Sequence, residues 1–242
     1  MKNKTLIIAA VTLFLTSCTI SSKNNNWANI NQFDGLLFFI NKNNSLGVSS
    51  LKQRPLIPSV GYDLPTWENL LPNAQREYRS GIHMGIDFTA PLGHEIRSSF
   101  SGVVVRSNKE YKDVDIQIYN SYLKTSAVLG KTPEDIYSNI LLGKAVVIDH
   151  GYSVVNDYRV ITVYAHLSEI SDEIFPGAIV NRGQIIGKSG NTGTSSGALK
   201  NDKGSHLHWE MHFDNKNDRY YLGQNIPGPN LYQNLKSIFV KE

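Results

Sequence analysis

The chain has 242 residues, 40% of them hydrophobic, and its 24 Lys and Arg residues nearly balance 21 Asp and Glu residues, for a formal net charge of +3. A surface this close to neutral offers no basic footprint for nucleic acid. The length suits one sizeable domain with an appendage, and the single cysteine excludes an intrachain disulfide and a cysteine-ligated zinc.

Residues 1–17 have the features of a secretory signal peptide. Lys2 and Lys4 give a positive start, and residues 6–15 form an apolar stretch. A helix needs about 20 apolar residues to cross a bilayer, so export followed by cleavage is the better interpretation. Without the two lysines the net charge falls from +3 to +1.

The signal peptide ends in Leu15-Thr16-Ser17-Cys18, which resembles the lipobox of bacterial lipoproteins. Cys18 would carry lipid and become the first residue, and the polar residues 18–26 would form a tether. Each buried lipid CH₂ contributes about 0.8 kcal/mol, so several acyl chains would hold the protein at a membrane of the cell envelope. Thr19 favours the outer membrane if the organism has two membranes. The alternative is an ordinary signal peptide with an incidental cysteine.

Residues 27–77 are expected to wrap around a more regular domain. The apolar run 36–40 fits either a buried strand or part of a helix, because periodicity cannot decide at this length. After it the chain is rich in Asn, Ser and Pro, which favours irregular structure with turns.

Short β-like runs separated by Gly and Pro fill residues 78–225 and indicate an all-β or β-dominated domain. Strands are expected within 82–88, 102–105, 145–149, 158–166, 178–180, 184–186 and 206–213. Residues 226–242 are assigned to a C-terminal extension.

One insertion, residues 107–142, separates two strands that should be neighbours in the sheet. Within it, Thr132 and Pro133 precede two acidic residues, a pattern typical of a helix start with Thr132 as N-cap. Gly143 is well placed to end that helix. The insertion is therefore expected to carry a short helix.

The residues with metal-binding chemistry lie far apart in the chain. His206 and His208 share one face of an expected strand, because strand side chains alternate, and the apolar residues between them face the other way. His83 and Asp87 add a nitrogen and a hard oxygen. Two imidazoles and a carboxylate suit zinc, with a fourth position left open as in catalytic sites. His166, at the end of an expected strand, gains significance only beside these residues.

The chain resembles the M23 (LytM/lysostaphin-type) zinc metallopeptidases of bacterial cell walls. Order, identity and spacing agree apart from the insertion. The resemblance rests on the segments 81–88, 90–93, 102–104, 146–151, 164–168, 183–187, 190–193 and 206–210. It implies a mainly β fold with an antiparallel-sheet peptidase domain.

The resemblance also implies the roles of individual residues. His83, Asp87 and His208 would be the ligands of one Zn²⁺ per chain, and His166 and His206 the catalytic pair. One histidine would help to deprotonate water and the other would stabilise the oxyanion and protonate the leaving amine, with the assignment left open.

The expected function is hydrolysis of amide bonds in the peptide stems or cross-bridges of peptidoglycan. Two alternatives remain. One is a non-catalytic regulator of other cell-wall hydrolases, and the other is a latent enzyme in which residues 27–79 or the insertion cover the groove or donate a blocking ligand. Nucleotide binding is rejected, because Gly187-Lys188-Ser189 lacks the first glycine of the phosphate-binding motif at position 182.

Three further polar residues have secondary interpretations. Glu210 is expected to hold a histidine ring rather than to bind metal. His150 is expected to end a strand in a structural role. His212 either is another polar residue of the site strand or contacts substrate.

Overall fold

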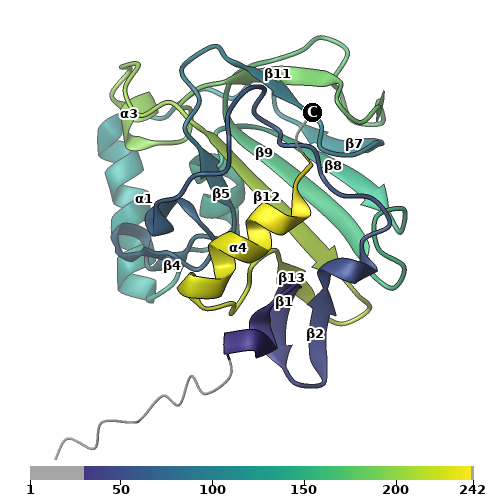
Figure 1. Cartoon of the computed structure of the whole chain (residues 1–242). Helices are drawn as coiled ribbons and strands as arrows, with labels where there is room; N and C mark the ends of the chain where they lie inside the picture. The colour runs from purple at the N-terminus through teal and green to yellow at the C-terminus, as the bar shows by residue number, and fades with distance from the viewer. Residues whose placement is uncertain (1–29, 241–242) are drawn as a thin grey trace, which may run out of the picture.

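The computed structural model describes residues 30–240, so the expected signal peptide, Cys18 and the tether lie outside the described residues. Within residues 30–240 no helix combines the length and the apolar character needed to cross a membrane. The described chain is built around one large sheet with helices on both of its faces (Figure 1).

Nine strands, paired antiparallel throughout, form the central sheet of the described region. They are β5 (Ile86–Phe88), β6 (Glu95–Arg97), β7 (Gly102–Ser107), β8 (Lys144–Gly151), β9 (Arg159–Ile170), β10 (Ile179–Val180), β11 (Ile185–Ser189), β12 (Leu207–Asp214) and β13 (Arg219–Tyr221). The order β10-β7-β8-β9-β11-β6 describes most of the sheet, and β12 pairs with β9, β5 and β13. The expectation of a mainly antiparallel β fold is confirmed.

The longest strand, β9, pairs with two different strands in succession along the same edge. Its residues 159–165 pair with β12, whereas residues 167–170 pair with β11. The sheet therefore splits at His166, and the split opens a place for side chains between β11 and β12.

Strand β12 shows the alternation expected from its sequence. Its apolar side chains are at most 1% exposed and belong to the main core: Leu207, Trp209, Met211 and Phe213. Its polar residues His208, Glu210 and His212 point to the opposite face, which we call the site face. Burial of the apolar set fixes the register, because a shift by one residue would place all four in the site.

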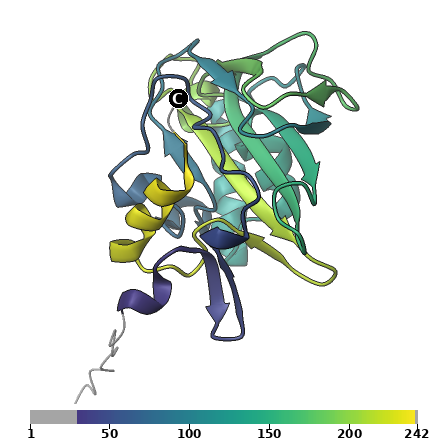
Figure 2. The same cartoon turned by 45° about the vertical axis from the view of Figure 1, so that its right-hand side comes forward.

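The core face of the sheet is covered by segments from both ends of the described chain. The hairpin of β1 (Leu36–Asn41) and β2 (Asn44–Gly47) lies beside α4 (Gly228–Ile238) (Figure 2). The ambiguous run 36–40 is thus a strand. Phe38 stacks on Tyr220 and contacts Phe213 in the main core. The short helix η1 (Ile30–Phe33) precedes this hairpin. The elements that lead from the hairpin to the site are η2 (Val48–Ser50), η3 (Glu68–Leu70), β3 (Gln75–Arg76), η4 (Glu77–Arg79) and β4 (Gly81–Ile82).

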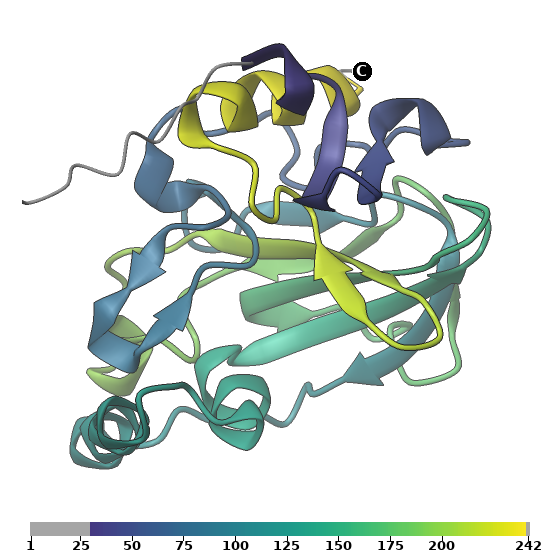
Figure 3. The same cartoon turned by 90° about the horizontal axis from the view of Figure 1, so that it is seen from below.

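The insertion packs on the other face of the sheet. Figure 3 shows its main helix, α1, and the C-terminal helix α4 on opposite sides of the sheet. Strands β7 and β8 are neighbours, as expected. Between them lie α1 (Ile116–Leu129), α2 (Glu134–Ile136) and the π-helical turn η5 (Tyr137–Leu141). A small helix α3 (Ser195–Ala198) lies near α1. Tyr119, Tyr137 and Leu142 form a second apolar cluster with Ala145 and Val163 of the sheet.

The prediction of one short helix in the insertion was incomplete. Helix α1 was missed because only Tyr119 and Ser126 of its residues are buried, which leaves little apolar periodicity to detect. The second helix begins at Glu134 with Pro133 as N-cap, whereas the prediction had Thr132 as N-cap and Pro133 as the first helical residue. The Thr132 hydroxyl instead donates to the Arg79 carbonyl oxygen at 2.6 Å. Gly143 follows η5 with a φ of 64°, which fits its expected role at the helix end.

Candidate metal centre

Strand pairing brings the two halves of the expected metal site together. Asp87 on β5 lies directly opposite His208 on β12, so the carboxylate and the imidazole project from adjacent positions on the same face. His83 follows β4 and reaches the same point through a short turn. Only glycine fits at position 85 of this turn, because a Cβ there would lie 2.5 Å from the Trp209 carbonyl oxygen.

The three expected ligand atoms converge. His83 Nε2 lies 2.9 Å from Asp87 Oδ1 and 3.0 Å from His208 Nδ1, and His208 Nδ1 lies 2.8 Å from Asp87 Oδ1. The side chains are buried, and their ligand atoms all lie within 4.8 Å of one another. A tetrahedral zinc with bonds of about 2.0–2.2 Å separates its ligand atoms by about 3.3–3.6 Å. The three atoms therefore need to move apart by only about half an ångström, and their side chains fit that ion.

Each of these side chains is oriented by a hydrogen bond on the side away from the converging ligand atoms. His83 Nδ1 lies 2.9 Å from the Leu71 carbonyl oxygen, which fixes the proton on Nδ1 and leaves Nε2 with its lone pair. Arg76 donates to the second oxygen of Asp87 at 3.2 Å. His208 Nε2 lies 2.8 Å from Glu210 Oε1, which leaves Nδ1 for the metal.

The electrostatics of the cluster favour an ionised carboxylate. Burial opposes ionisation of Asp87, but the charge of His83 and hydrogen bonds from His208 and His83 hold the pKa of Asp87 well below its usual range. Burial lowers the pKa of His83. Burial would also lower the pKa of His208, but its hydrogen bonds with Asp87 and Glu210 prevail and raise this pKa to about 9.

His166 and His206 lie beside this cluster at the split of the sheet. Their ring centroids are 4.7 Å apart, and His206 Nε2 lies 3.8 Å from Asp87 Oδ1. Each ring places Nδ1 2.8 Å from a backbone carbonyl oxygen, that of Thr192 for His166 and that of Gly204 for His206. The proton therefore sits on Nδ1 in both rings, and Nε2 is the free basic nitrogen.

The backbone at His166 is strained in a way that aims its ring. His166 has a φ of 61° inside strand β9, a left-handed conformation that non-glycine residues rarely adopt. Ala165 and His166 together face the single residue Ala145 of β8, which is a β-bulge. Burial and the neighbouring His206 and His208 keep the pKa of His166 well below its usual range.

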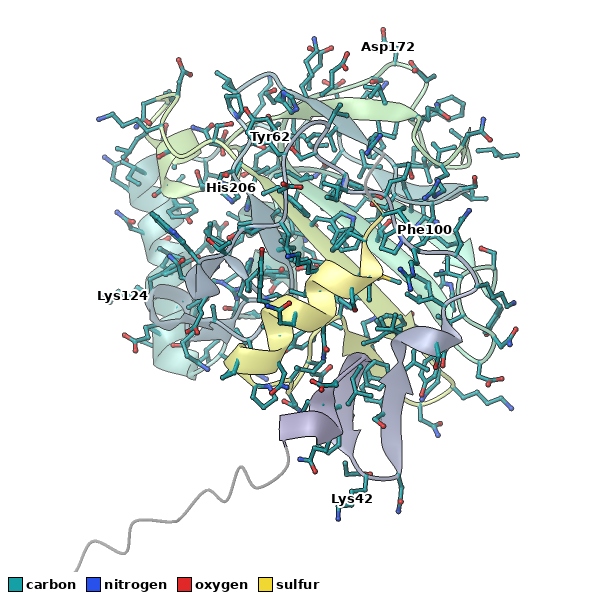
Figure 4. The ribbon with its side chains drawn as sticks, in the orientation of Figure 1. Lys42, Tyr62, Phe100, Lys124, Asp172 and His206 are labelled. Atoms are coloured by element: carbon teal, nitrogen blue, oxygen red, sulfur yellow. The ribbon has the colours of Figure 1, made fainter. Side chains whose placement is uncertain are left out.

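A cavity of about 480 Å³ opens in front of these residues. Asp87, His166, His206 and His208 line it, together with residues 193–195 and two further parts of the chain. His206, labelled in Figure 4, lies just before β12. Arg76, Tyr78 and Arg79 come from the segment before β4, and the insertion contributes Tyr119, Leu123, Tyr137, Leu141 and Leu142.

The structure brings together the five residues that the sequence singled out, and three further groups that contact them were not anticipated. Arg76, Tyr137 and the Thr192 carbonyl group contact the site from distant segments, and no local pattern distinguishes them. Glu210 holds the ring of His208, as expected. His212 is 6% exposed, and its Nε2 lies 2.7 Å from Glu210 Oε2.

Comparisons with known proteins agree with this geometry. The model of the family described as Peptidase family M23 matches residues 81–219, more than half of the chain. The peptidoglycan DD-endopeptidase ShyA of Vibrio cholerae serotype O1 is 34% identical over 134 residues, which are 55% of this chain and 21% of that protein. The chain thus spans about a fifth of the length of this curated relative.

Solved structures give a weaker likeness. A zinc containing peptidase from Vibrio cholerae has 23% identity and a TM-score of 0.42, with 71% of this chain and 39% of that chain covered. The catalytic domain of lysostaphin from Staphylococcus simulans has 19% identity and a TM-score of 0.35, with 69% of this chain and 83% of that chain covered.

Proposed function

The chain belongs to peptidase family M23, and on that premise we propose that it is a zinc endopeptidase that hydrolyses amide bonds in the peptide part of peptidoglycan. The observation that carries the proposal is the convergence of His83 Nε2, Asp87 Oδ1 and His208 Nδ1 at separations near 3 Å, beside two histidines with free Nε2 atoms.

The chemistry needs an electrophile, a base and an acid. A zinc ion held by His83, Asp87 and His208 would polarise the scissile carbonyl group and lower the pKa of water. His166 and His206 divide the proton transfers. One Nε2 accepts a proton from the attacking water, and the other ring, once protonated, stabilises the oxyanion and donates to the leaving amine. Both rings have the same Nδ1 anchoring, so the two assignments remain alternatives.

The substrate is proposed from two observations. The relative ShyA is named a peptidoglycan DD-endopeptidase, and the family match over residues 81–219 contains the site residues. The cavity is about 480 Å³ in volume and lies between the insertion and the segment that carries Arg76, Tyr78 and Arg79, so a peptide could enter between two walls. The bond cleaved is within the stems or the cross-bridges.

The arrangement supports an active enzyme over a non-catalytic regulator. A regulator that only binds the wall has no need of three converging ligand atoms and two anchored imidazoles. Among the described residues of the segment 27–77, hydrogen bonds to a ligand side chain come from Arg76, which donates to Asp87, and from the Leu71 carbonyl oxygen, which accepts from His83 Nδ1. The carbonyl oxygen lies on the side of His83 away from the ligand atoms, and a guanidinium cannot act as a blocking metal ligand.

Attachment to the envelope forms a separate part of the proposal. Cys18 would be lipidated, and the folded part would act on peptidoglycan within reach of its tether, at the outer membrane if the organism has two. Replacement of Cys18 by Ala should release the protein from the membrane fraction. Mass spectrometry of the mature N-terminus should detect acyl chains on Cys18, and an unmodified cysteine would contradict the anchor without affecting the catalytic proposal.

The catalytic proposal is tested with residues 19–242 and purified peptidoglycan of defined cross-bridge type. Released muropeptides are identified by mass spectrometry, with a chelator and the His208→Ala variant as controls. New fragments that disappear in both controls would establish the zinc endopeptidase and identify the bond. Absence of cleavage by a protein with one bound zinc per chain would overturn the proposed activity.

A further inference from the structure

Tyr137 connects the insertion to the metal site through hydrogen bonds. It begins the π-helical turn η5, its side chain is buried, and its ring lies under the Arg79 guanidinium, 5.1 Å from the guanidinium carbon. The Tyr137 hydroxyl group donates to Glu210 Oε1 and lies 3.4 Å from His208 Nε2. Within the described residues, Tyr137 is the residue of the insertion that hydrogen-bonds to the polar residues of β12.

Glu210 is the shared acceptor of three side chains. Its Oε1 accepts from Tyr137 and from His208 Nε2 at 2.8 Å, and its Oε2 accepts from His212 Nε2 at 2.7 Å. Glu210 is 2% exposed, so no solvent replaces a donor that is removed. A buried carboxylate with fewer donors is free to rotate about its terminal torsion, and the His208 ring that it holds would lose its fixed orientation.

Tyr137 also stands between two cavities. It lines the cavity of about 480 Å³ at the metal site and a second cavity of about 530 Å³ on the same face of the sheet, which Glu210 and His212 also line. Glu210 does not line the cavity at the metal site, so Tyr137 separates its carboxylate from that cavity.

We propose that Tyr137, with His212, is a positioning residue that fixes Glu210 and through it the metal ligand His208, so that the insertion contributes to zinc affinity. The inference rests on the zinc site of the proposed function. It gives the insertion a role beyond that of a wall of the cavity, because the turn η5 must be folded for the third donor to reach Glu210.

The test measures zinc affinity, not hydrolysis, on residues 19–242. Zinc is titrated into chelator-treated protein in competition with a chromophoric chelator. Tyr137→Phe should weaken zinc binding about tenfold, and Glu210→Gln about a hundredfold, the range found for partners of metal-bound histidines. The absorption spectrum of bound Co²⁺, which reports on ligand geometry, should change in both variants.

The matched control is Tyr111→Phe. Tyr111 lies in the same insertion and its hydroxyl group donates to the Ile140 carbonyl oxygen at 3.0 Å, so the change removes one hydroxyl group next to η5 without touching Glu210. Urea unfolding of the chelator-treated variants gives their stabilities. Weakened zinc binding in Tyr137→Phe alone supports the inference.

Two outcomes would overturn it. Wild-type zinc affinity in both Tyr137→Phe and Glu210→Gln would show that the hydrogen bonds do not position His208. An equal loss of affinity in Tyr111→Phe and Tyr137→Phe would show that only the general stability of the insertion matters. Because no substrate is present, failure to cleave peptidoglycan would bear on the proposed function and not on this inference.

Discussion

Two buried histidines on opposite faces of the central sheet show how different environments give one residue type different roles. His208 and His150 are each 5% exposed. On the site face, His208 lies between Asp87 and Glu210, 2.8 Å from a carboxylate oxygen of each. On the core face, His150 Nδ1 lies 2.8 Å from the Ser101 carbonyl oxygen and Nε2 lies 2.8 Å from Thr162 Oγ1.

The difference in partners reverses the effect of burial. Burial lowers the pKa of His150 to about 4, because the hydrogen bond with the Ser101 carbonyl oxygen and the charge of Asp149 compensate little. The same burial acts on His208, but two carboxylates raise its pKa to about 9. Burial alone therefore does not identify a functional histidine. A ring nitrogen directed at other ligand atoms, with a carboxylate behind the ring, does identify one.

The largest expected effect comes from removing a ligand on the site face. His208→Ala deletes one of the three converging donors and should abolish both zinc binding and hydrolysis of peptidoglycan. His150→Gln, on the core face, should keep one zinc per chain and the wild-type rate. Metal analysis and muropeptide release measure the two properties. Wild-type hydrolysis in His208→Ala would contradict the distinction between the two histidines.

The next effect separates ligands from catalytic groups. His166→Ala and His206→Ala remove a general acid or base, so kcat should fall about 10²–10⁴-fold. Zinc should remain bound at one per chain, because His83, Asp87 and His208 are intact. The measurement combines steady-state kinetics with metal analysis on the same samples. Loss of zinc in either variant would mean that its histidine is a ligand.

A third effect concerns His150 and the pH dependence of stability. Because the pKa of His150 is about 4 in the folded chain and 6.5 ordinarily, between these pH values the unfolded chain binds a proton that the folded chain does not. The free energy of unfolding should thus fall as the pH decreases from 6.5 toward 4, by up to about 3 kcal/mol.

The matched variant for this effect is His150→Gln, compared with the wild type by urea unfolding in the presence of a chelator. Titration of the site histidines is common to both proteins, so the difference between them isolates His150. The stability advantage of the wild type at pH 7.5 should shrink at pH 4.5. A difference that stays constant across this range would show that His150 has an ordinary pKa in the folded chain.

The contrast between the two faces also explains what the sequence could reveal. Strands such as β8, β9 and β12 are rich in alternating apolar residues, and their positions were predicted closely. His83, Asp87 and His208 were found from ligand chemistry and spacing together with the resemblance to a family. The apolar alternation of a strand is a local signal, and the ligand pattern consists of a few short motifs.

Contacts between distant segments left no such signal. Helix α1 was missed because most of its surface is exposed, and Tyr137 was missed because its partner Glu210 is 73 residues away. The left-handed backbone of His166 follows from the change of strand partner along β9, which requires the whole sheet to be known. Sequence patterns thus predicted the residues of the site better than the contacts that orient them.

Arg76 provides the smallest effect and bears on how the segment before β4 acts on the site. Its guanidinium donates to Asp87 Oδ2 at 3.2 Å, whereas Oδ1 faces His83 and His208, so it holds the carboxylate with one oxygen directed at the other ligands. Arg76→Gln should weaken zinc binding roughly tenfold and lower kcat/KM in subsaturating zinc, with the wild-type rate restored by excess zinc. Titration of activity against free zinc measures this shift.

The variant Arg76→Lys, which keeps the charge but loses the planar guanidinium, should give an intermediate zinc affinity. A rise in kcat/KM in Arg76→Gln would instead mean that the segment restrains the enzyme, as a latent peptidase requires, because release of the contact would then open the site.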